Sequence, residues 1–399
     1  MFSSLKVRNF RIYWLGMLVS LIGTWIQQVT QSWLVFQLTN SAFLLGLVGF
    51  LNSIPVLLLS LFGGVLADRI NKRVILITTQ IAFMILAFLL AVLTQFKIIT
   101  PLQIMFIAVL NGIIMAFDAP SRQAVVVELV GKTHLPNAIA LNSVAFSSSR
   151  IIGPALAGIL VATIGMSGCF YINGASFLAV ILALFYIRIN SNILKAREKS
   201  SAFRDLKEGL VFVKNNRLIL ALISLVAVAS LFGVAHLILM PIFANDILKV
   251  GIKGLGVLMS SAGAGALIGG LVLARLGDFK YKARFLTFAS LLFSISLILF
   301  SLSRVYLLSS IALVLVGAAS VMSIALVNTI LQTKVEDKFR GRVMSVFMLT
   351  FAGMMPFGNL LSGILAQKFG APFTVLASGI ACTVLFIAIN IIYPDLRKI

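Results

Sequence analysis

Residues 64–73 read Gly-Val-Leu-Ala-Asp-Arg-Ile-Asn-Lys-Arg, a short charged segment between two long apolar stretches at residues 41–67 and 74–96. About 20 mostly apolar residues are enough to cross a lipid bilayer as a helix. The same alternation of apolar stretch and charged loop continues in both directions along the chain. The pattern predicts a protein that crosses a membrane many times.

Twelve apolar stretches of this length fit the 399 residues. They lie at residues 12–37, 41–67, 74–96, 100–118, 138–163, 166–187, 218–244, 254–274, 285–303, 305–332, 343–366 and 371–393. Hydrophobic residues make up 60% of the chain and charged residues only 11%, whereas a soluble fold carries about 25% charged residues. We therefore expect an all-helical integral membrane protein whose surface is covered by the lipid bilayer.

The basic residues predict how the chain is oriented in the membrane. If the N-terminus is cytoplasmic, 26 of the 32 Lys and Arg residues lie on the cytoplasmic side, 5 lie on the opposite side, and Arg150 falls inside a span. Cytoplasmic loops carry such an excess, so we expect both termini in the cytoplasm and the bacterial inner membrane as the location. Topology and anionic headgroups explain the net charge of +21. Nucleic acid is therefore not an expected partner.

The longest polar segment, residues 190–217, divides the spans into six and six. We predict a six-helix bundle at residues 1–189, a cytoplasmic linker at 190–217 and a second six-helix bundle at 218–399. An internal repeat supports this division. Gly153 and Gly158-Ile-Leu recur 205 positions later as Gly358 and Gly363-Ile-Leu, and Gly63-Gly64 recurs 206 positions later as Gly269-Gly270. Transporters built from two parallel repeats bind substrate between their halves, so the repeat favours a central cavity.

The segment at residues 64–73 resembles the signature loop of the major facilitator superfamily, roughly Gly-x-x-x-Asp-Arg-x-Gly-Arg-Arg/Lys. Asn71 replaces the second glycine and tolerates the left-handed backbone that a tight turn demands. The resemblance implies a cytoplasmic gate that opens and closes during alternating access. The gate residues would be Gly64, Asp68, Arg69, Lys72 and Arg73. The alternative is a solvated turn that only obeys the positive-inside rule.

A second motif lies in the predicted fifth span, at Arg150, Gly153, Pro154 and Gly158. It resembles the helix-5 motif of the superfamily's drug/proton antiporters. Small residues let a facing helix approach closely and Pro154 bends the helix axis, although plain packing of small residues is the alternative. Together with residues 118–123, Asp-Ala-Pro-Ser-Arg-Gln, the motif makes the chain similar to the enterobactin-exporter and macrolide-efflux branch.

Arg150 needs a partner or a cavity, because a guanidinium at membrane depth costs about 2.5–3.5 kcal/mol on insertion scales. Asp118, at the end of the predicted span 100–118, is the candidate partner. We treat the pair as a possible proton or charge relay. Every acidic residue falls at a span end or in a loop by this reading, so proton coupling is implied mainly by the resemblance.

Polar residues form a stripe on the first span at the helical spacing i, i+3, i+4 and i+7, namely Thr24, Gln27, Gln28 and Gln31. Such a stripe favours a water-filled cavity, whose lining Asn142, His236 and Asn328 would complete. With Arg150, this lining predicts anionic or neutral polar-aromatic substrates. The alternative is that the same side chains only hydrogen-bond between helices, at about 0.6 kcal/mol each.

Enzyme motifs are missing from the sequence. There is no Gly-x-x-x-x-Gly-Lys-Ser/Thr and no His-Glu-x-x-His, and the two histidines are His134 and His236. We expect no enzyme, no metal site and no cofactor, with the proton gradient as energy source. We predict a monomeric secondary carrier that exports a small siderophore-like or drug-like molecule by alternating access and proton antiport. A multidrug or macrolide efflux pump is the first alternative, and a non-transporting scaffold or sensor is the second.

Overall fold

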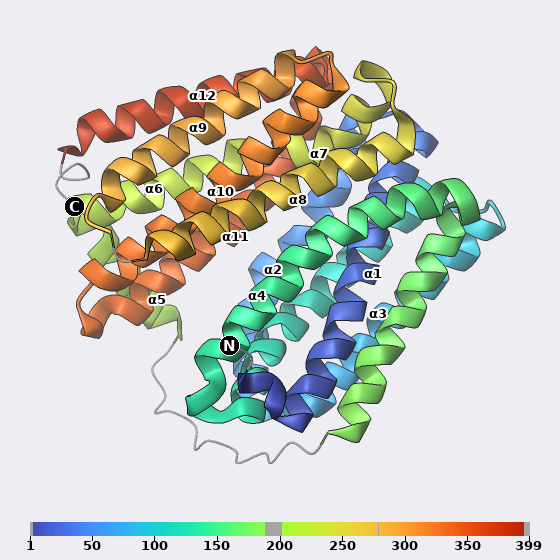
Figure 1. The fold of residues 1–399 in the computed structure, drawn as a ribbon, viewed down its shortest axis with the longest axis horizontal. Coiled ribbons are helices and arrows are strands. Elements are labelled where there is room, and N and C mark those ends of the chain that lie inside the picture. The colour runs from blue at the N-terminus through green and yellow to red at the C-terminus, as the bar shows by residue number, and fades with distance from the viewer. Residues whose placement is uncertain (1–2, 188–201, 278, 395–399) are drawn as a thin grey trace. The chain divides into compact units, whose positions relative to one another are not determined.

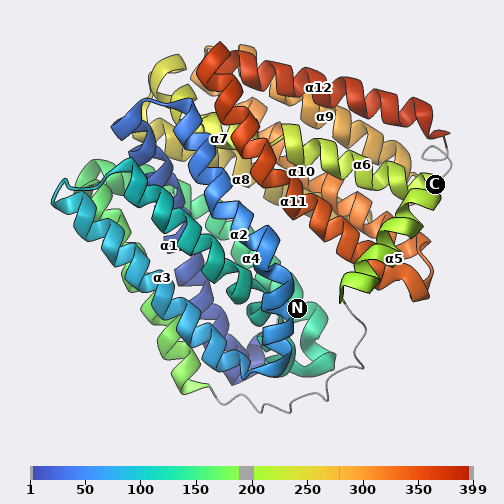
Figure 2. The same cartoon turned by 180° about the vertical axis from the view of Figure 1, so that it is seen from behind.

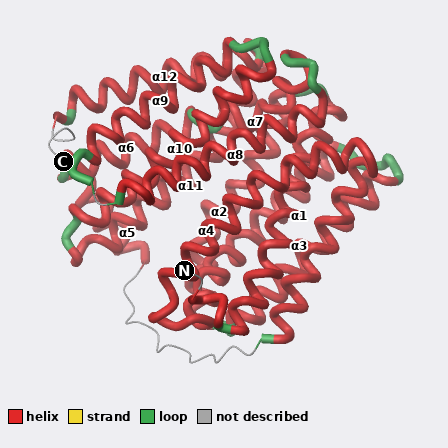
Figure 3. The backbone as a smooth tube through the Cα atoms, viewed as in Figure 1, coloured by secondary structure: helices red, strands yellow, loops and turns green. Residues whose placement is uncertain are grey.

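The computed structural model describes residues 3–187, 202–277 and 279–394, and it does not describe the side chains of residues 61, 67, 68, 132 and 202–205. All regular elements in these ranges are helices (Figures 1 and 3). They are η1 (Ser3–Lys6), α1 (Arg8–Thr39), α2 (Ala42–Arg69), α3 (Lys72–Gln95), α4 (Pro101–Tyr186), α5 (Ala202–Asn215), α6 (Arg217–Phe232), α7 (Ala235–Ile242), η2 (Phe243–Ile247), α8 (Gly251–Leu276), α9 (Lys282–Leu302), α10 (Tyr306–Lys334), α11 (Asp337–Phe369) and α12 (Ala371–Ile392). The predicted all-helical class is confirmed for this part of the chain.

Twelve membrane crossings follow from these helices. Among the described residues, eleven helices are long and apolar enough to cross a membrane, and one of them, Thr133–Tyr186, has 54 residues. At a rise of about 1.5 Å per residue, that helix is more than twice as long as a hydrocarbon core of about 30 Å is thick. It therefore supplies two crossings, and the prediction of twelve transmembrane helices is confirmed.

Two glycines divide α4 into its three crossings. Gly131 has φ 65° and ψ −179°, and Gly165 has φ 77° and ψ 174°, so neither is helical. The helix that contains Asp118 runs on to Gly131 instead of ending at residue 118. Asp118 thus lies well inside a helix, which corrects its predicted position at a span end.

The predicted linker at residues 190–217 contains the helix α5, which the sequence analysis did not anticipate. The part of the linker before residue 202 lies outside the described residues. The next span, Arg217–Ile247, is built from α6, α7 and η2. Its axis is interrupted at Gly233, the C-cap of α6, and Pro241 lies inside α7.

The chain divides into two compact units. One consists of Met1–Asn40, Leu51–Lys199 and Ile252–Gly256, and the other of Ser41–Phe50, Ser200–Gly251 and Val257–Ile399. In the first unit, α4 folds back on itself and packs against α1 and α3 (Figure 2). In the second, α9 packs against α10 and α12, and α11 packs against α6 and α5.

The repeated glycines have equivalent surroundings in the two units. A Cβ atom on Gly63 would collide with the carbonyl oxygen of Ala116, and one on Gly269 with that of Ala318. The following glycines, Gly64 and Gly270, have open space at the same position. In each unit, the first glycine of the pair therefore lets two helices touch through their backbones.

Candidate functional site

A cationic and aromatic cluster lies between α1 and α4 in the first unit. The Cζ atom of Arg150 is 6.0 Å from the ring centroid of Trp25, and the Trp25 ring packs edge-on against Phe146 at 6.0 Å. A guanidinium at this distance is attracted to the face of the ring. Trp25 thus helps to hold Arg150, whose predicted partner was Asp118.

Helical spacing extends this cluster along α4. Asn142, Phe146 and Arg150 follow one another at intervals of four residues and share a face of the helix. Phe146 is 50% exposed and Arg150 is partly exposed. The buried Oδ1 atom of Asn142 has no hydrogen-bond partner within the described part of the chain. On this face, the guanidinium of Arg150 and the ring of Phe146 are accessible, whereas the Oδ1 atom of Asn142 is buried.

Close packing against α1 holds the cluster in place. A Cβ atom on Gly153 would collide with Cβ of Trp25, so the glycine allows the indole to lie against α4. Arg150, Gly153 and Asn142 were predicted from the sequence, whereas Trp25 and Phe146 were not. The available signal was that Trp25 lies inside the polar stripe of α1, between Thr24 and Gln27.

The predicted stripe on α1 divides into two groups. Gln27 is held by the neighbouring helix, because its Oε1 atom accepts a 2.6 Å hydrogen bond from Nδ2 of Asn173. The Thr24 hydroxyl donates to the Ser20 carbonyl of its own helix at 2.8 Å. Gln28 is exposed and Gln31 is partly exposed, and a role of these two in a cavity lining stays a prediction.

The predicted lining residues of the second unit contact their own helices. His236 is buried, and its Nδ1 atom is 2.7 Å from the Gly233 carbonyl, where the backbone breaks between α6 and α7. The Oδ1 atom of Asn328 accepts a 2.5 Å bond from Nε2 of Gln332, one turn further along α10. In the structure, both side chains thus take part in hydrogen bonds between or within helices.

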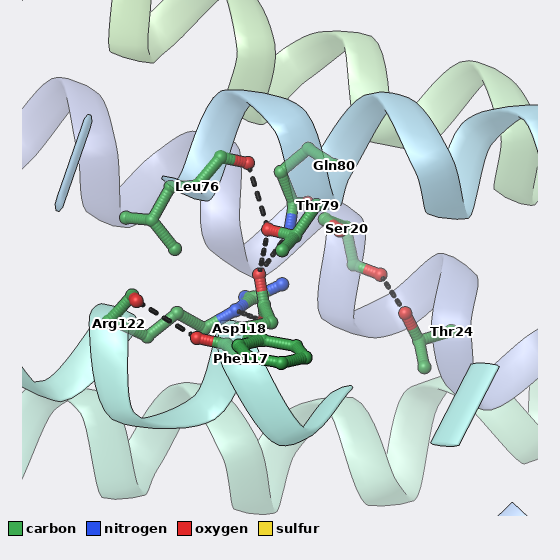
Figure 4. A network of polar contacts seen from close by, with 9 residues as sticks. Ser20, Thr24, Leu76, Thr79, Gln80, Phe117, Asp118 and Arg122 are labelled. Carbon is green, nitrogen blue, oxygen red and sulfur yellow. Dashed lines mark hydrogen bonds and ion pairs between the residues drawn. The ribbon is translucent and has the colours of Figure 1, made fainter. Parts of the chain in front are cut away.

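A second polar cluster surrounds Asp118, which is fully buried in α4. Its Oδ1 atom accepts hydrogen bonds from the Thr79 hydroxyl at 2.7 Å and from Nε2 of Gln80 at 2.8 Å, both on α3 (Figure 4). Its Oδ2 atom pairs with Nε of Arg122, one turn further along α4. The partner of Asp118 is therefore Arg122, and not Arg150 as we had expected.

Two polar atoms beside this ion pair are unsatisfied. The hydroxyl of Tyr13 and the Oε1 atom of Gln80 are buried without a hydrogen-bond partner among the described residues. Burying a polar group without a partner costs about 1–3 kcal/mol. The hydrogen bonds of this cluster are therefore incomplete, since the Tyr13 hydroxyl and the Gln80 amide oxygen each lack a partner among the described residues.

Two of the three basic residues of the 64–73 segment contact α4. Lys72 forms a 2.7 Å ion pair with Glu128, and Nη2 of Arg73 donates to the Phe185 carbonyl at 3.0 Å. A cation at the C-terminal end of a helix interacts favourably with its dipole. Asn71 is the N-cap of α3, with φ −59° and its side chain bonded to the amide of Arg73. It does not adopt the left-handed backbone that we had expected.

The remaining gate residues have less definite surroundings. Arg69 is exposed at the end of α2, and Gly64 has open space around it. The side chain of Asp68 lies outside the described residues. The contacts of Lys72 and Arg73 thus show how the loop is anchored to its own unit.

The described residues contain no cluster of three or more His, Cys, Asp or Glu side chains that could hold a metal ion. Cys169 and Cys382 are free and buried in helices.

Comparisons with known proteins extend over nearly the whole chain. A family model described as transmembrane secretion effector matches residues 1–398. The staphyloferrin A transporter of Staphylococcus aureus is 29% identical over 92% of this chain and 93% of its own length. Macrolide efflux protein A of Streptococcus pyogenes is 23% identical over 98% of this chain and 96% of its own. The enterobactin exporter EntS of Shigella boydii is 24% identical over 98% of this chain and 92% of its own length.

Solved structures show the same fold at low identity. A bacterial homologue of the lysosomal transporter Spinster superposes with a TM-score of 0.76 at 13% identity, covering 98% of both chains. A D-xylose–proton symporter also gives a TM-score of 0.76, at 12% identity, and covers 97% of this chain and 99% of its own. At these identities the likeness concerns the fold alone.

Proposed function

We propose an export function from the premise that this chain belongs to the transmembrane secretion effector family of the major facilitator superfamily. Membership makes it a multi-pass membrane transporter of small molecules and not an enzyme. The proposed activity is secondary active export of a small organic molecule by alternating access, driven by proton antiport. The match along residues 1–398 to a secretion family carries this proposal.

The proposed substrate is a siderophore-like molecule that bears an anionic group next to a flat or aromatic part. Arg150 supplies a partly exposed cation, and Trp25 and Phe146 supply ring faces beside it. A guanidinium pairs with a carboxylate in a planar geometry through two parallel hydrogen bonds. Two full-length relatives support this class, since one is named a staphyloferrin A transporter and another an enterobactin exporter.

Multidrug or macrolide efflux is the second candidate. The relative named macrolide efflux protein A covers 98% of this chain, and exposed aromatic side chains such as Phe146 suit apolar drugs as well as chelators. A non-transporting scaffold or sensor is the third candidate, and it would need none of the clustered polar groups described above.

We place proton coupling at Asp118 and gating at the 64–73 segment. Asp118 is buried and paired with Arg122, so protonation of the carboxylate would release that guanidinium and alter the contact between α3 and α4. Lys72 and Arg73 anchor the same two helices through Glu128 and Phe185. A change at Asp118 can thus reach the gate segment through α3. The proposed location is the inner membrane, with both termini in the cytoplasm and the carrier acting as a monomer.

Comparison of metabolites inside and outside the cell tests the proposed function. We expect deletion of the gene, in cells grown without iron, to remove one chelator from the medium and trap it in the cytoplasm, and complementation to reverse both changes. Untargeted mass spectrometry of the two fractions provides the measurement. Unchanged chelator levels together with increased macrolide susceptibility would favour the second candidate. No change in any compound would support the scaffold.

Arg150→Gln is expected to weaken transport of the compound found in that comparison. A charge-assisted hydrogen bond contributes about 1.5–3 kcal/mol, so the KM for transport should rise about tenfold to a hundredfold. Arg150→Lys keeps the charge but loses the planar guanidinium group, so its KM for transport should lie between those of the wild type and Arg150→Gln. Lys368→Gln is the matched control, because Lys368 also lies over a ring, that of Phe369 at 5.4 Å, but at the end of α11. A wild-type KM in Arg150→Gln would remove Arg150 from substrate binding.

A further inference from the structure

The helix α5 presents two chemically different faces, and one of them packs inside the second unit. The ring of Phe212 stacks on Phe339 of α11 with centroids 4.3 Å apart and an interplanar angle of 18°. Glu208 pairs with Arg342 of α11 at 3.0 Å, and Val213 is 4% exposed. This inner face therefore fixes α5 against the beginning of α11 and neutralises the acidic side chain of Glu208.

The outer face of α5 consists of Lys207, Leu210, Val211 and Lys214, at the helical positions i, i+3, i+4 and i+7. Leu210 is 48% exposed and Val211 is 52% exposed, and both lysines are exposed. Two apolar side chains thus lie between two cations. Because Glu208 is turned toward α11, the outer face is positively charged.

The helix α5 comes immediately before a membrane span in the chain. It ends at Asn215, and the membrane span that begins with α6 starts at Arg217, which is itself exposed. Figures 1 and 2 show α5 at the end of its unit, next to the beginning of α6. A single residue between the two helices therefore keeps the C-terminal end of α5 next to the start of this membrane span.

We propose that the outer face of α5 binds the anionic headgroup surface of the membrane. Amphipathic helices with apolar residues between lysines bind at the boundary of headgroups and acyl chains. Lysines next to a membrane span are attracted to anionic lipids. Leu210 and Val211 would enter the boundary while Lys207 and Lys214 contact lipid phosphates. Since α11 is joined to the inner face, the lipid contact would also fix the position of α11. This inference does not depend on the proposed export function.

Spin-label accessibility in the full chain tests the proposal. The two native cysteines are buried, so a label can be placed at Leu210→Cys. The protein is reconstituted in nanodiscs of phosphatidylcholine alone or with about one third phosphatidylglycerol. We expect the collision rate of the label with a water-soluble relaxation agent to fall at least twofold in the anionic nanodiscs. An equal collision rate in both lipids would overturn the proposal.

Charge variants show whether the lysines cause the effect. Lys207→Gln/Lys214→Gln should abolish the fall in collision rate. Lys280→Gln/Lys334→Gln, which removes two other exposed lysines of the same unit, should preserve it. Retention of phosphatidylglycerol on the unlabelled protein, measured by native mass spectrometry, should fall in the first double variant only. A fall in collision rate that survives Lys207→Gln/Lys214→Gln, or equal lipid retention in both double variants, would overturn the proposal. Because neither measurement uses transport, the result is independent of whether the chain is an exporter.

Discussion

Asp118→Ala is expected to destabilise the first unit by about 3–5 kcal/mol, because it leaves the Arg122 side chain, which is only 20% exposed, without its partner. The substitution also leaves the Thr79 hydroxyl and the Gln80 amide without their shared acceptor. The loss of stability is measured by thermal unfolding of the purified protein, with size-exclusion chromatography to monitor the folded fraction. Wild-type thermal stability in Asp118→Ala would show that neither the ion pair within α4 nor the hydrogen bonds from α3 to Asp118 contribute to the stability of the unit.

Asp337→Asn is the matched control for this loss. Asp337 and Arg340 also form an Asp–Arg pair within one helix, at 2.6 Å, but the Asp337 side chain is 89% exposed. Exposed pairs contribute about 0–1 kcal/mol, so the control should unfold almost as the wild type does. A similar loss in both variants would point to a general effect of removing an acidic residue.

The neutral double variant Asp118→Asn/Arg122→Gln separates stability from coupling. The asparagine side chain of this variant can still accept hydrogen bonds from Thr79 and Gln80. Because no unpaired charge remains, the stability should largely recover. If Asp118 carries the coupled proton, this variant should exchange substrate down its gradient but not export it against a gradient. Full accumulation driven by the pH gradient in this variant would place coupling elsewhere.

Gly269→Ala and Gly270→Ala, at adjacent positions in α8, are expected to change stability in opposite directions. A methyl group at Gly269 collides with the Ala318 carbonyl, so α8 and α10 must separate, at about 1–3 kcal/mol. A methyl group at Gly270 meets open space, and alanine favours a helix over glycine by about 1 kcal/mol. Thermal unfolding of the two variants gives the comparison.

The same contrast should recur between Gly63→Ala and Gly64→Ala in the first unit, where Ala116 replaces Ala318 as the obstructing residue. Equal stability within either pair would contradict the packing seen in that unit. Agreement between the two pairs would show that the repeat in the sequence is also a repeat in packing.

The sequence predicted the spans well because membrane crossing depends on composition and length, both of which can be read locally. It also carried enough information for two features that we missed. Asp118 and Arg122 are four residues apart, which places them on one face of a helix. The outer face of α5 follows the same spacing, but the polar composition of residues 190–217 led us to treat the segment as a linker.

Other contacts could not be predicted from local pattern. Thr79 and Gln80 reach Asp118 only because α3 packs against α4 at the position of Asp118 along the helix. Trp25 reaches Arg150 because Gly153 leaves room for the indole, and the two residues lie 125 positions apart in the sequence. Such pairings depend on how helices are rotated and shifted against each other, and neither quantity is encoded in the hydropathy of one span.

The two breaks in α4 have a consequence for which substitutions the chain can accept. At Gly131 and Gly165, a Cβ atom would meet nothing within 4 Å, yet φ is positive and ψ is close to 180°. That region of the backbone is essentially restricted to glycine, at a cost of about 1–3 kcal/mol for other residues. The restriction is one of chirality, since the L configuration is penalised for any side chain, however small. At Gly63 and Gly269 the restriction is one of volume, so mutational tolerance at the four glycines has two separate origins.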